Sequence, residues 1–436
     1  MAEPNHKLHV TVFPWLALGH MIPYLQLSKL IATKGHTISF ISTPRNIANL
    51  GNLFLKFFNC LNQPKMNAES TTDVPETHIG YLKKAFDGLS EPFSEYLQAS
   101  KPDWIVYDIL HYWVPPIAEK LGVRRALFCT FNAASIIVIN GPSSIMINGR
   151  DPRKTTNVAY RPFEARRIME YPTAGVTGAE LNDSYRTGLA YAGSEVIAIR
   201  TCMELEPEWI QLLGEIQGKP VIPLGLLPAK ATDDDVDDDI IEWLDRQRAK
   251  SVVYVALGTE VTVSEEEIQG LAHGLELCGL PFFWTIRKAS VFLPDGFEER
   301  VKGRGVVRAE WAPQGRILSH GSVGGFVTHC GWGSVVEGLS FGVPLIMFPC
   351  NLDQPLVARM LAGMKIGQEI PRNERDGSFT SVSVAETIRQ VVAEEEGKIY
   401  RGNAGSMQKK VFGDKRLQDQ CVDSFIKFLE NQRAGM

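Results

Sequence analysis

Short apolar runs alternate with amphipathic stretches along most of this 436-residue chain. In the first third, four buried runs predict strands, at 7–13, 36–43, 103–108 and 124–130. The stretch 22–35 predicts a helix, with Pro23 near its start and Gly35 at its end. Strands separated by helices form right-handed crossovers, so this part of the chain predicts a parallel sheet.

The same alternation restarts after the middle of the chain. Further strands are predicted at 251–258, 282–287, 305–310, 324–329 and 344–349. A helix begins at Ser264, which forms a Ser-x-x-Glu capping box with Glu267. The fold class is therefore α/β, with a second doubly wound parallel domain.

Between the two patterns, residues 140–200 have weak periodicity and predict helices and loops over a cleft. We place the N-terminal domain at 1–218, a linker at 219–239 and the C-terminal domain at 240–415. The linker holds six aspartates within seven residues, which favours a solvated hinge over a metal site. The final amphipathic helix, about 416–436, is expected to pack back on the first domain.

Composition narrows the function. Apolar residues make up 44% of the chain and charged residues 22%, and the net charge of -5 with no long basic block disfavours nucleic-acid binding. No apolar run reaches the ~18 residues of a membrane span, and the N-terminus lacks a signal-peptide layout. The seven cysteines are scattered without a Cys-x-x-Cys pair, which favours free thiols in the cytoplasm. A monomer is the default expectation.

Small and polar residues follow the predicted strands of the second domain. Glycines and a serine at the start of a helix let backbone amides approach an anion, and a histidine beside them can donate to a phosphate oxygen. The residues concerned are Gly258, Thr259, His329, Gly331, Gly333 and Ser334. A histidine at a strand end is also often structural, and a glycine-rich turn is often only a turn.

Two further carboxylates extend this pattern. Glu337 lies about one helical turn beyond Gly333, where it could accept both hydroxyls of a ribose. Asp353 and Gln354 follow a third strand, and their side chains supply an acceptor and a mixed donor–acceptor for sugar hydroxyls. Together these strand ends predict a site for a nucleotide with an attached polyol. Dinucleotide and P-loop fingerprints are absent from these positions, which disfavours a dehydrogenase or a P-loop enzyme.

The first domain suggests a different chemistry. His20 lies at the carboxyl end of the first predicted strand, just before a helix, and Asp108 ends the third. A histidine held by a carboxylate can take a proton from a hydroxyl, because the carboxylate fixes its tautomer. His20 could instead cap a helix or lie in the core. No Gly-x-Ser-x-Gly elbow supports a hydrolase.

The run from Trp311 to Gln354 resembles the signature box of plant UDP-dependent glycosyltransferases of small molecules (family 1). The likeness rests on its length of 44 residues, its opening Trp-Ala-Pro-Gln, its His-Cys-Gly-Trp core and its closing Asp-Gln. It extends over nearly the whole chain. The resemblance implies the GT-B fold, in which two facing Rossmann-like domains leave an interdomain cleft, with the acceptor mainly in the first and the donor in the second.

The resemblance also implies roles for individual residues. Trp311 would stack on uracil, Ala312 would offer its backbone to the base, and Gln314 would bind the ribose together with Glu337. His329, Ser334 and Thr259 would bind the diphosphate. The other implied donor positions are Gly258, Gly331, Trp332 and Gly333. Asp353 and Gln354 would hold the sugar, which Thr130 could also reach, and His20 would be the general base oriented by Asp108.

The implied reaction is an inverting transfer from a UDP-sugar, without a metal or other cofactor. The stretches FPWLALGHMIP, KKAFDGL and VVYVALGTE are most similar to the branch that adds a sugar to an existing glycoside, such as a terpenoid or flavonoid glycoside. In that branch UDP-glucose and UDP-rhamnose are both donors, and Gln354 favours glucose over galactose. Transfer to an aglycone hydroxyl, non-catalytic binding of a UDP-sugar or glycoside, and a UDP-sugar hydrolase or epimerase are the alternatives.

Two departures from the family pattern bear on specificity. Gly333 stands where the family usually has asparagine, so one side-chain contact to phosphate or sugar is lost. The segments 51–76 and 288–293 look shorter than in relatives. They normally shape the rims of the acceptor and donor sites.

Overall fold

The chain folds into two compact units built from discontinuous segments. The computed structural model describes residues 7–50, 68–74, 78–139, 158–170, 182–229, 238–258, 261, 263–286 and 292–433. The first unit comprises Met1–Arg150, Tyr171–Leu227 and Lys415–Met436, and the second comprises Asp151–Glu170 and Pro228–Asp414. Each unit contains one six-stranded sheet in which all paired strands are parallel.

The first sheet has the strand order β2-β1-β3-β4-β5-β6. Its strands are β1 (His9–Phe13), β2 (Thr37–Phe40), β3 (Trp104–Tyr107), β4 (Arg124–Cys129), β5 (Val196–Ile199) and β6 (Val221–Pro223). All four residues of β3 and of β5 are buried, as is typical of a parallel sheet covered on both faces. The four strands predicted in the first third of the chain are confirmed.

Two strands of this sheet lie where the sequence pattern was weak. β5 lies within the stretch 140–200 that was expected to hold helices and loops, and four apolar residues are too few to separate a strand from a helix by periodicity. β6 lies within the predicted linker and pairs with β5, Ile197 opposite Val221. Residues 219–227 therefore belong to the first unit, because this pairing fixes them to its sheet.

Helices connect the strands of the first unit. They are α1 (Leu18–Thr33), α2 (Pro44–Asn49), α3 (Ile79–Asp87), α4 (Ser90–Ser100), α5 (Val114–Lys120), α6 (Ala133–Ile139), α8 (Asp183–Ala192), α9 (Pro207–Gln217) and α18 (Lys415–Arg433). α1 begins four residues earlier than predicted, so His20 lies in its first turn and not before it. Proline has no backbone N–H, so Pro23 leaves the carbonyl of Gly19 without its helical hydrogen bond. The helix tolerates this because Gly19 lies in its first turn.

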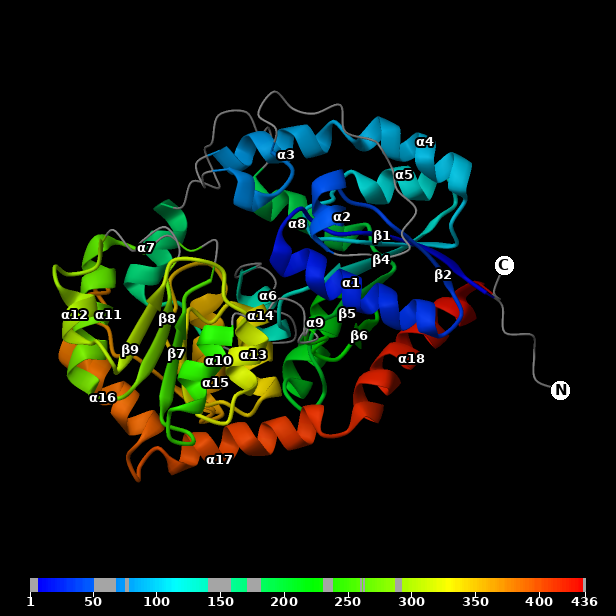
Figure 1. Ribbon diagram of the computed structural model, residues 1–436. Coiled ribbons are helices and arrows are strands. Elements are labelled where there is room, and N and C mark those ends of the chain that lie inside the picture. Colours follow the sequence, from blue (N-terminus) through cyan, green and yellow to red (C-terminus); the bar gives the residue numbers. More distant parts are fainter. Residues whose placement is uncertain are drawn as a thin grey trace. The chain divides into compact units, whose positions relative to one another are not determined.

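The C-terminal helix completes the core of the first unit. α18 runs alongside α1 in Figure 1, and its residues Val422, Phe425 and Leu429 join the apolar core that covers the sheet. The indole N–H of Trp104 on β3 donates to the carbonyl of Leu429 at 3.2 Å. A segment more than 300 residues away in the sequence thus covers the central strands.

The second sheet has the strand order β12-β11-β10-β7-β8-β9. Its strands are β7 (Val252–Ala256), β8 (Phe282–Thr285), β9 (Gly305–Arg308), β10 (Val323–Thr328), β11 (Leu345–Met347) and β12 (Gly367–Glu369). The five strands predicted here are confirmed, and β12 adds a short edge strand that the sequence did not predict.

The helices of the second unit include one from the first half of the chain. They are α7 (Pro162–Glu170), α10 (Asp238–Asp245), α11 (Glu265–Cys278), α12 (Phe297–Arg300), α13 (Gln314–Ser319), α14 (Trp332–Ser340), α15 (Gln354–Gly363), α16 (Ser381–Val392) and α17 (Lys398–Met407). The capping box of Ser264 and Glu267 is confirmed, since each side chain bonds the other's backbone N–H. Residues 151–170 group with this unit by their contacts.

Each sheet has one point at which the chain reverses its direction of winding. In the first sheet this point lies between β1 and β3, and in the second between β7 and β10. Ligands of open α/β sheets bind outside the carboxyl ends of the strands at such switch points. The strand order alone therefore indicates two candidate ligand-binding positions, one at the switch point of each sheet.

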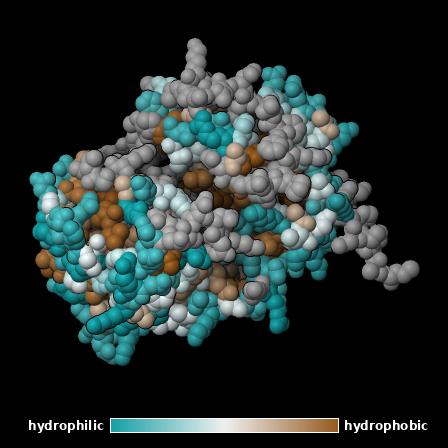
Figure 2. All heavy atoms as spheres, viewed as in Figure 1, coloured by the Kyte–Doolittle hydropathy of each residue, from teal (hydrophilic) through white to brown (hydrophobic). Residues whose placement is uncertain are grey.

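Figure 2 shows mostly hydrophilic side chains on the face in view, with hydrophobic atoms in smaller groups between them. Among the helices of the described ranges, none combines the length and the apolar character needed to cross a membrane.

Candidate functional site

His20 and Asp108 meet at the switch point of the first sheet. His20 extends from the first turn of α1, the helix that follows β1, and Asp108 comes directly after β3. Nδ1 of His20 lies 2.8 Å from Oδ2 of Asp108. The carboxylate is completely buried, whereas 13% of the histidine side chain is exposed. The two residues that sequence analysis paired are therefore in contact, with the imidazole as the accessible partner.

The surroundings of Asp108 keep it ionised. Burial alone would raise the pKa of Asp108, but the charge and hydrogen bond of His20, helped by the Trp15 amide, hold this pKa below its usual value of 3.8. The amide of Ile109 donates to the other carboxylate oxygen at 2.7 Å. An ionised Asp108 keeps the proton of His20 on Nδ1 and leaves Nε2 as the basic nitrogen, the tautomer that a general base needs.

Thr130 lies beside this pair, and a buried glutamate fixes its loop. The Thr130 hydroxyl is 3.2 Å from Nδ1 of His20, and the ring of Phe131 packs edge-on against the imidazole. In the following residues, the Asn132 side chain and the amides of Ala133 and Ala134 all donate to the carboxylate of Glu206. Sequence analysis missed Glu206, because only the fold brings it to this loop.

In the second unit, three polar side chains surround that of Gln314. Nε2 of Gln314 lies 2.5 Å from a carboxylate oxygen of Glu337 and 3.4 Å from the hydroxyl of Ser334. The hydroxyl of Tyr254 on β7 donates to the Gln314 carbonyl oxygen at 3.4 Å. These residues come from β7, α13 and α14, which surround the second switch point. Sequence analysis named Gln314, Ser334 and Glu337 but missed Tyr254.

Trp311 and Ala312 precede this group on the chain. Trp311 is 62% exposed, the most exposed tryptophan among the described large apolar side chains, whereas Ala312 is buried. An exposed indole can stack on a nucleotide base, and the neighbouring cluster around Gln314 has donors and acceptors that could bind a ribose.

His329 is enclosed by glycines at the end of β10. A Cβ on Gly258 would lie 2.8 Å from the imidazole, and one on Gly331 would clash with Nε2. Gly258 also has φ +81°, which favours glycine. Nδ1 of His329 is buried without a hydrogen-bond partner in the described part of the chain. The two glycines are therefore required for the close approach of the backbone to this ring.

Backbone amides surround the same position. Gly331 precedes α14, and Trp332, Gly333 and Ser334 form its first turn, where amides lack carbonyl partners within the helix. Cys330 adopts φ +67°, a left-handed conformation that is rare for a residue with a side chain. The Trp332 side chain is buried, so a ligand at this turn would meet its backbone and not the indole. Thr259, predicted at the same site, lies outside the described residues.

Asp353 and Gln354 lie where β11 leads into α15. Both are nearly buried. Oε1 of Gln354 accepts from the amides of Cys350 and Asn351 at 3.0 and 3.1 Å, and its Nε2 donates to the side chain of Asn351 at 2.9 Å. Gln354 therefore shapes the loop before α15 in addition to any contact it makes with a ligand.

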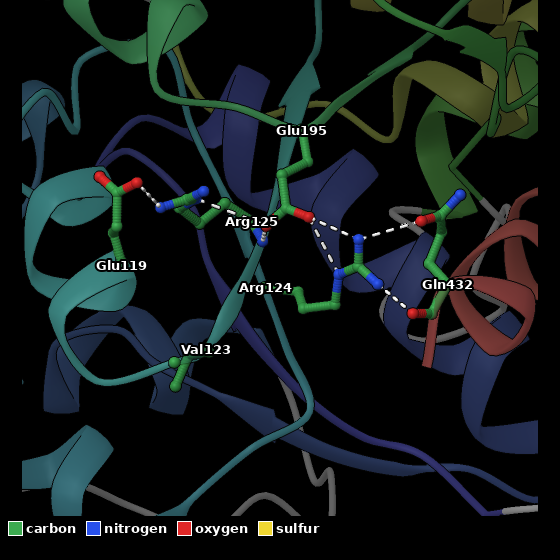
Figure 3. A pocket seen from close by; sticks show the side chains of 7 residues that line it. Glu119, Val123, Arg124, Arg125, Glu195 and Gln432 are labelled. Carbon is green, nitrogen blue, oxygen red and sulfur yellow. Dashed lines mark hydrogen bonds and ion pairs between the residues drawn. The ribbon is translucent and has the colours of Figure 1, made fainter. Parts of the chain in front are cut away.

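A separate pocket lies at the opposite edge of the first sheet. It is lined at the amino ends of β4 and β5, where Glu195 pairs with Arg124 and Arg125. Figure 3 shows Glu195 between the two arginines, with Arg124 also reaching Gln432 of α18. Glu119 lies 3.4 Å from Arg125 and supplies the second carboxylate, so the charges compensate one another. The hydrogen bond from Arg124 to Gln432 ties α18 to the sheet, away from the strand ends that carry His20.

The buried histidines give the protein a specific pH dependence. Burial lowers the pKa of His329 from 6.5 to about 4, and that of His111, packed among aromatic rings, to about 3. These histidines stay neutral in the folded chain but take up a proton in the unfolded chain below pH 6.5, so stability falls as the pH drops from 6.5 towards 4. For His329 alone we expect a loss of about 2 kcal/mol between pH 7 and pH 5.

Urea denaturation at both pH values measures this loss. His329→Gln removes the titrating group, so the difference between the two unfolding free energies should shrink by about 2 kcal/mol relative to wild type. An unchanged difference would show that His329 is solvated or protonated in the folded protein.

The two sheets and their strand ends define a class of protein. Two Rossmann-like units with polar clusters at their switch points form the GT-B architecture, as predicted. A solved structure described as TcCGT1 in complex with UDP superimposes with a TM-score of 0.78, covering 98% of this chain and 100% of that one at 22% identity. In the described ranges no group of three or more His, Cys, Asp or Glu side chains is placed to hold a metal ion.

The chain belongs to the UDP-glucoronosyl and UDP-glucosyl transferase family, whose model matches residues 192–415. UDP-glycosyltransferase 91B1 of Arabidopsis thaliana is 73% identical over 466 aligned positions that cover 100% of both chains. Soyasaponin III rhamnosyltransferase of Glycine max is 39% identical, over 99% of this chain and 97% of its own length. The protein is therefore a plant-type UDP-glycosyltransferase, and the family resemblance in its sequence is confirmed.

The alignment with UDP-glycosyltransferase 91B1 also shows that this chain is shorter than that relative. Its 466 positions exceed the 436 residues of this chain, so at least 30 of them have no counterpart here. That the missing positions fall in the two segments 51–76 and 288–293 stays a prediction. Most of 51–76 and of 288–293 lies outside the described residues.

Proposed function

We propose that this enzyme transfers glucose from UDP-glucose to a hydroxyl of a small-molecule glycoside, with inversion at the anomeric carbon. The observation that carries the proposal is the contact between His20 and the completely buried Asp108. This pair has the geometry of a general base whose tautomer is fixed by a carboxylate. It is found at the switch point of a sheet, where substrates of such folds bind.

The chemical step is a single displacement. Nε2 of His20 takes the proton of the acceptor hydroxyl while the acceptor oxygen attacks the anomeric carbon of the donor. The bond from that carbon to the diphosphate oxygen breaks, and its electron pair leaves with UDP. Attack from the opposite face converts an α-linked donor into a β-glucoside. The imidazolium that forms is stabilised by Asp108.

The donor binds the second unit in this proposal. Trp311 stacks on uracil, Ala312 offers its backbone, and Glu337 with Gln314 binds the ribose. The diphosphate lies at the start of α14, where the helix dipole and the amides stabilise the negative charge of the leaving UDP. Neutral His329, Ser334 and Thr259 add donors, and Gly258, Gly331 and Gly333 allow the backbone to approach.

The sugar and the acceptor complete the site. Asp353 and Gln354 hold the sugar hydroxyls, Thr130 contacts the sugar from the first unit, and the acceptor binds the first unit. Rhamnose is the second candidate sugar, because a relative that is 39% identical is named as a rhamnosyltransferase. We further expect the protein to be cytoplasmic, since the six described cysteines are all free thiols, as is usual in a reducing compartment. A monomer stays the default expectation.

A donor and acceptor panel tests the proposal. UDP-glucose, UDP-rhamnose and UDP-xylose are each incubated with several aglycones and their monoglucosides, and products are identified by mass. We expect transfer of glucose to the monoglucosides and little transfer to the aglycones. Preferred transfer to aglycones would overturn the acceptor assignment, and a preference for UDP-rhamnose would overturn the donor assignment.

A further inference from the structure

A segment from the first half of the chain belongs to the second unit and makes many contacts there. Residues 158–170, here called the strap, contain α7 and group with the second unit. In Figure 1 α7 lies beside α11, and Arg167 of the strap pairs with Glu267 of that helix at 3.0 Å. Glu267 in turn binds the buried Arg372 at 2.8 Å.

The strap holds α15, the helix that begins at Gln354. Glu164 of the strap contacts Arg359 of α15 at 2.5 Å, and the side chains of both are almost completely buried. Arg161 forms two hydrogen bonds with the carboxylate of Glu369 on β12, at 2.5 and 3.3 Å. Buried pairs of this kind fix relative geometry, because separating them leaves charges without partners in a dry environment.

Apolar packing supports the same attachment. Phe163 is buried, and its ring fills the space beside Gly377, where an added Cβ would lie 2.5 Å from the ring. Gly377 has φ +78°, so glycine is favoured there for its backbone as well. The strap is thus fixed by both its charged and its apolar side chains.

At its amino end the strap reaches the loop before α15. The hydroxyl of Tyr160 donates to the carbonyl of Leu352 at 2.8 Å. Leu352 adopts φ +51°, the left-handed region that side chains disfavour, so an external contact is needed to keep this turn in a single conformation. The next residue is Asp353, whose carboxylate lies close enough to Tyr160 for its charge to act on the phenol.

We propose that Tyr160 is a positioning residue for donor-sugar recognition. By holding the Leu352 carbonyl, its hydroxyl sets the direction in which Asp353 presents its carboxylate. The arrangement of the sugar-binding end of the second unit then depends on a residue from the first half of the chain. This inference rests on the proposed role of Asp353 in binding sugar hydroxyls.

Tyr160→Phe removes the hydroxyl and keeps the ring. Because one hydrogen bond orients the sugar contact, we expect KM for UDP-glucose to rise about 3- to 10-fold. The Kd of UDP should not change, because UDP lacks the sugar. Steady-state kinetics and calorimetric titration with UDP measure the two quantities. Tyr185→Phe on α8 of the first unit, where the tyrosine is 55% exposed, makes the same chemical change at a residue that takes no part in the contact with Leu352 and should alter neither.

Three outcomes decide the inference. An unchanged KM for UDP-glucose would overturn it. An equal loss of affinity for UDP and UDP-glucose would also overturn it, because it would show a general structural role. If wild type prefers UDP-rhamnose, the glucose assignment fails, but a selective rise in KM for UDP-rhamnose would still support Tyr160 as the positioning residue.

Discussion

His20→Ala is expected to lower kcat for sugar transfer by about 10²- to 10⁴-fold, the contribution of a positioned general base. The acceptor hydroxyl is a weak nucleophile until its proton is removed, and the imidazole is the accessible member of the pair that would remove it. The Kd of UDP should not change, because His20 belongs to the first unit. Alanine is also the best helix former for the first turn of α1, so the variant should fold.

Asp108→Asn serves as the matched variant. An amide keeps the size of the side chain but can donate to Nδ1, which favours the tautomer with its proton on Nε2. We expect kcat to fall about 10²- to 10³-fold, with UDP affinity unchanged. UDP release in the presence of a glycoside acceptor measures both variants. Wild-type rates in His20→Ala would remove the base assignment, and wild-type rates in Asp108→Asn would show that the histidine needs no orienting group.

The order of apolar runs was sufficient to predict nine of the twelve described strands and the positions of most candidate residues. Because parallel strands place their carboxyl ends at the same edge, a residue directly after a buried run is located as soon as the run is recognised. Asp108 and His329, which directly follow β3 and β10, were predicted in this way, whereas His20 lies farther on, in the first turn of α1. The prediction did not require the strand order, which only the fold supplies.

What the sequence could not predict depends on contacts between distant segments. β6 is three residues long and becomes a strand only by pairing with β5. Glu206 and Tyr160 stand in stretches with no motif. In the fold, the Glu206 carboxylate accepts hydrogen bonds from the amides after β4, and the Tyr160 hydroxyl donates to the turn before Asp353. Polar side chains that act across the fold leave no periodic signal, because each contact uses a single residue.

The pairing of Gln314 with Glu337 changes how the donor site is understood. Sequence analysis assigned each a separate contact with the ribose, whereas the structure shows the Gln314 amide donating to the Glu337 carboxylate. The amide thereby helps to hold the carboxylate in one orientation. A carboxylate held in place loses little conformational freedom when it accepts two ribose hydroxyls.

Glu337→Ala should therefore weaken UDP binding about 30- to 100-fold, because two charge-assisted hydrogen bonds to the ribose are lost and Gln314 loses one of its three partners. Glu337→Gln keeps the shape and one acceptor oxygen, so a smaller loss of about 5- to 10-fold is expected. Calorimetric titration with UDP measures both, and uracil alone, which has no ribose, should bind all three proteins equally. If UDP affinity were the same in Glu337→Ala and wild type, the ribose could not lie against α14, and the placement of the nucleotide on the second unit would have to be abandoned.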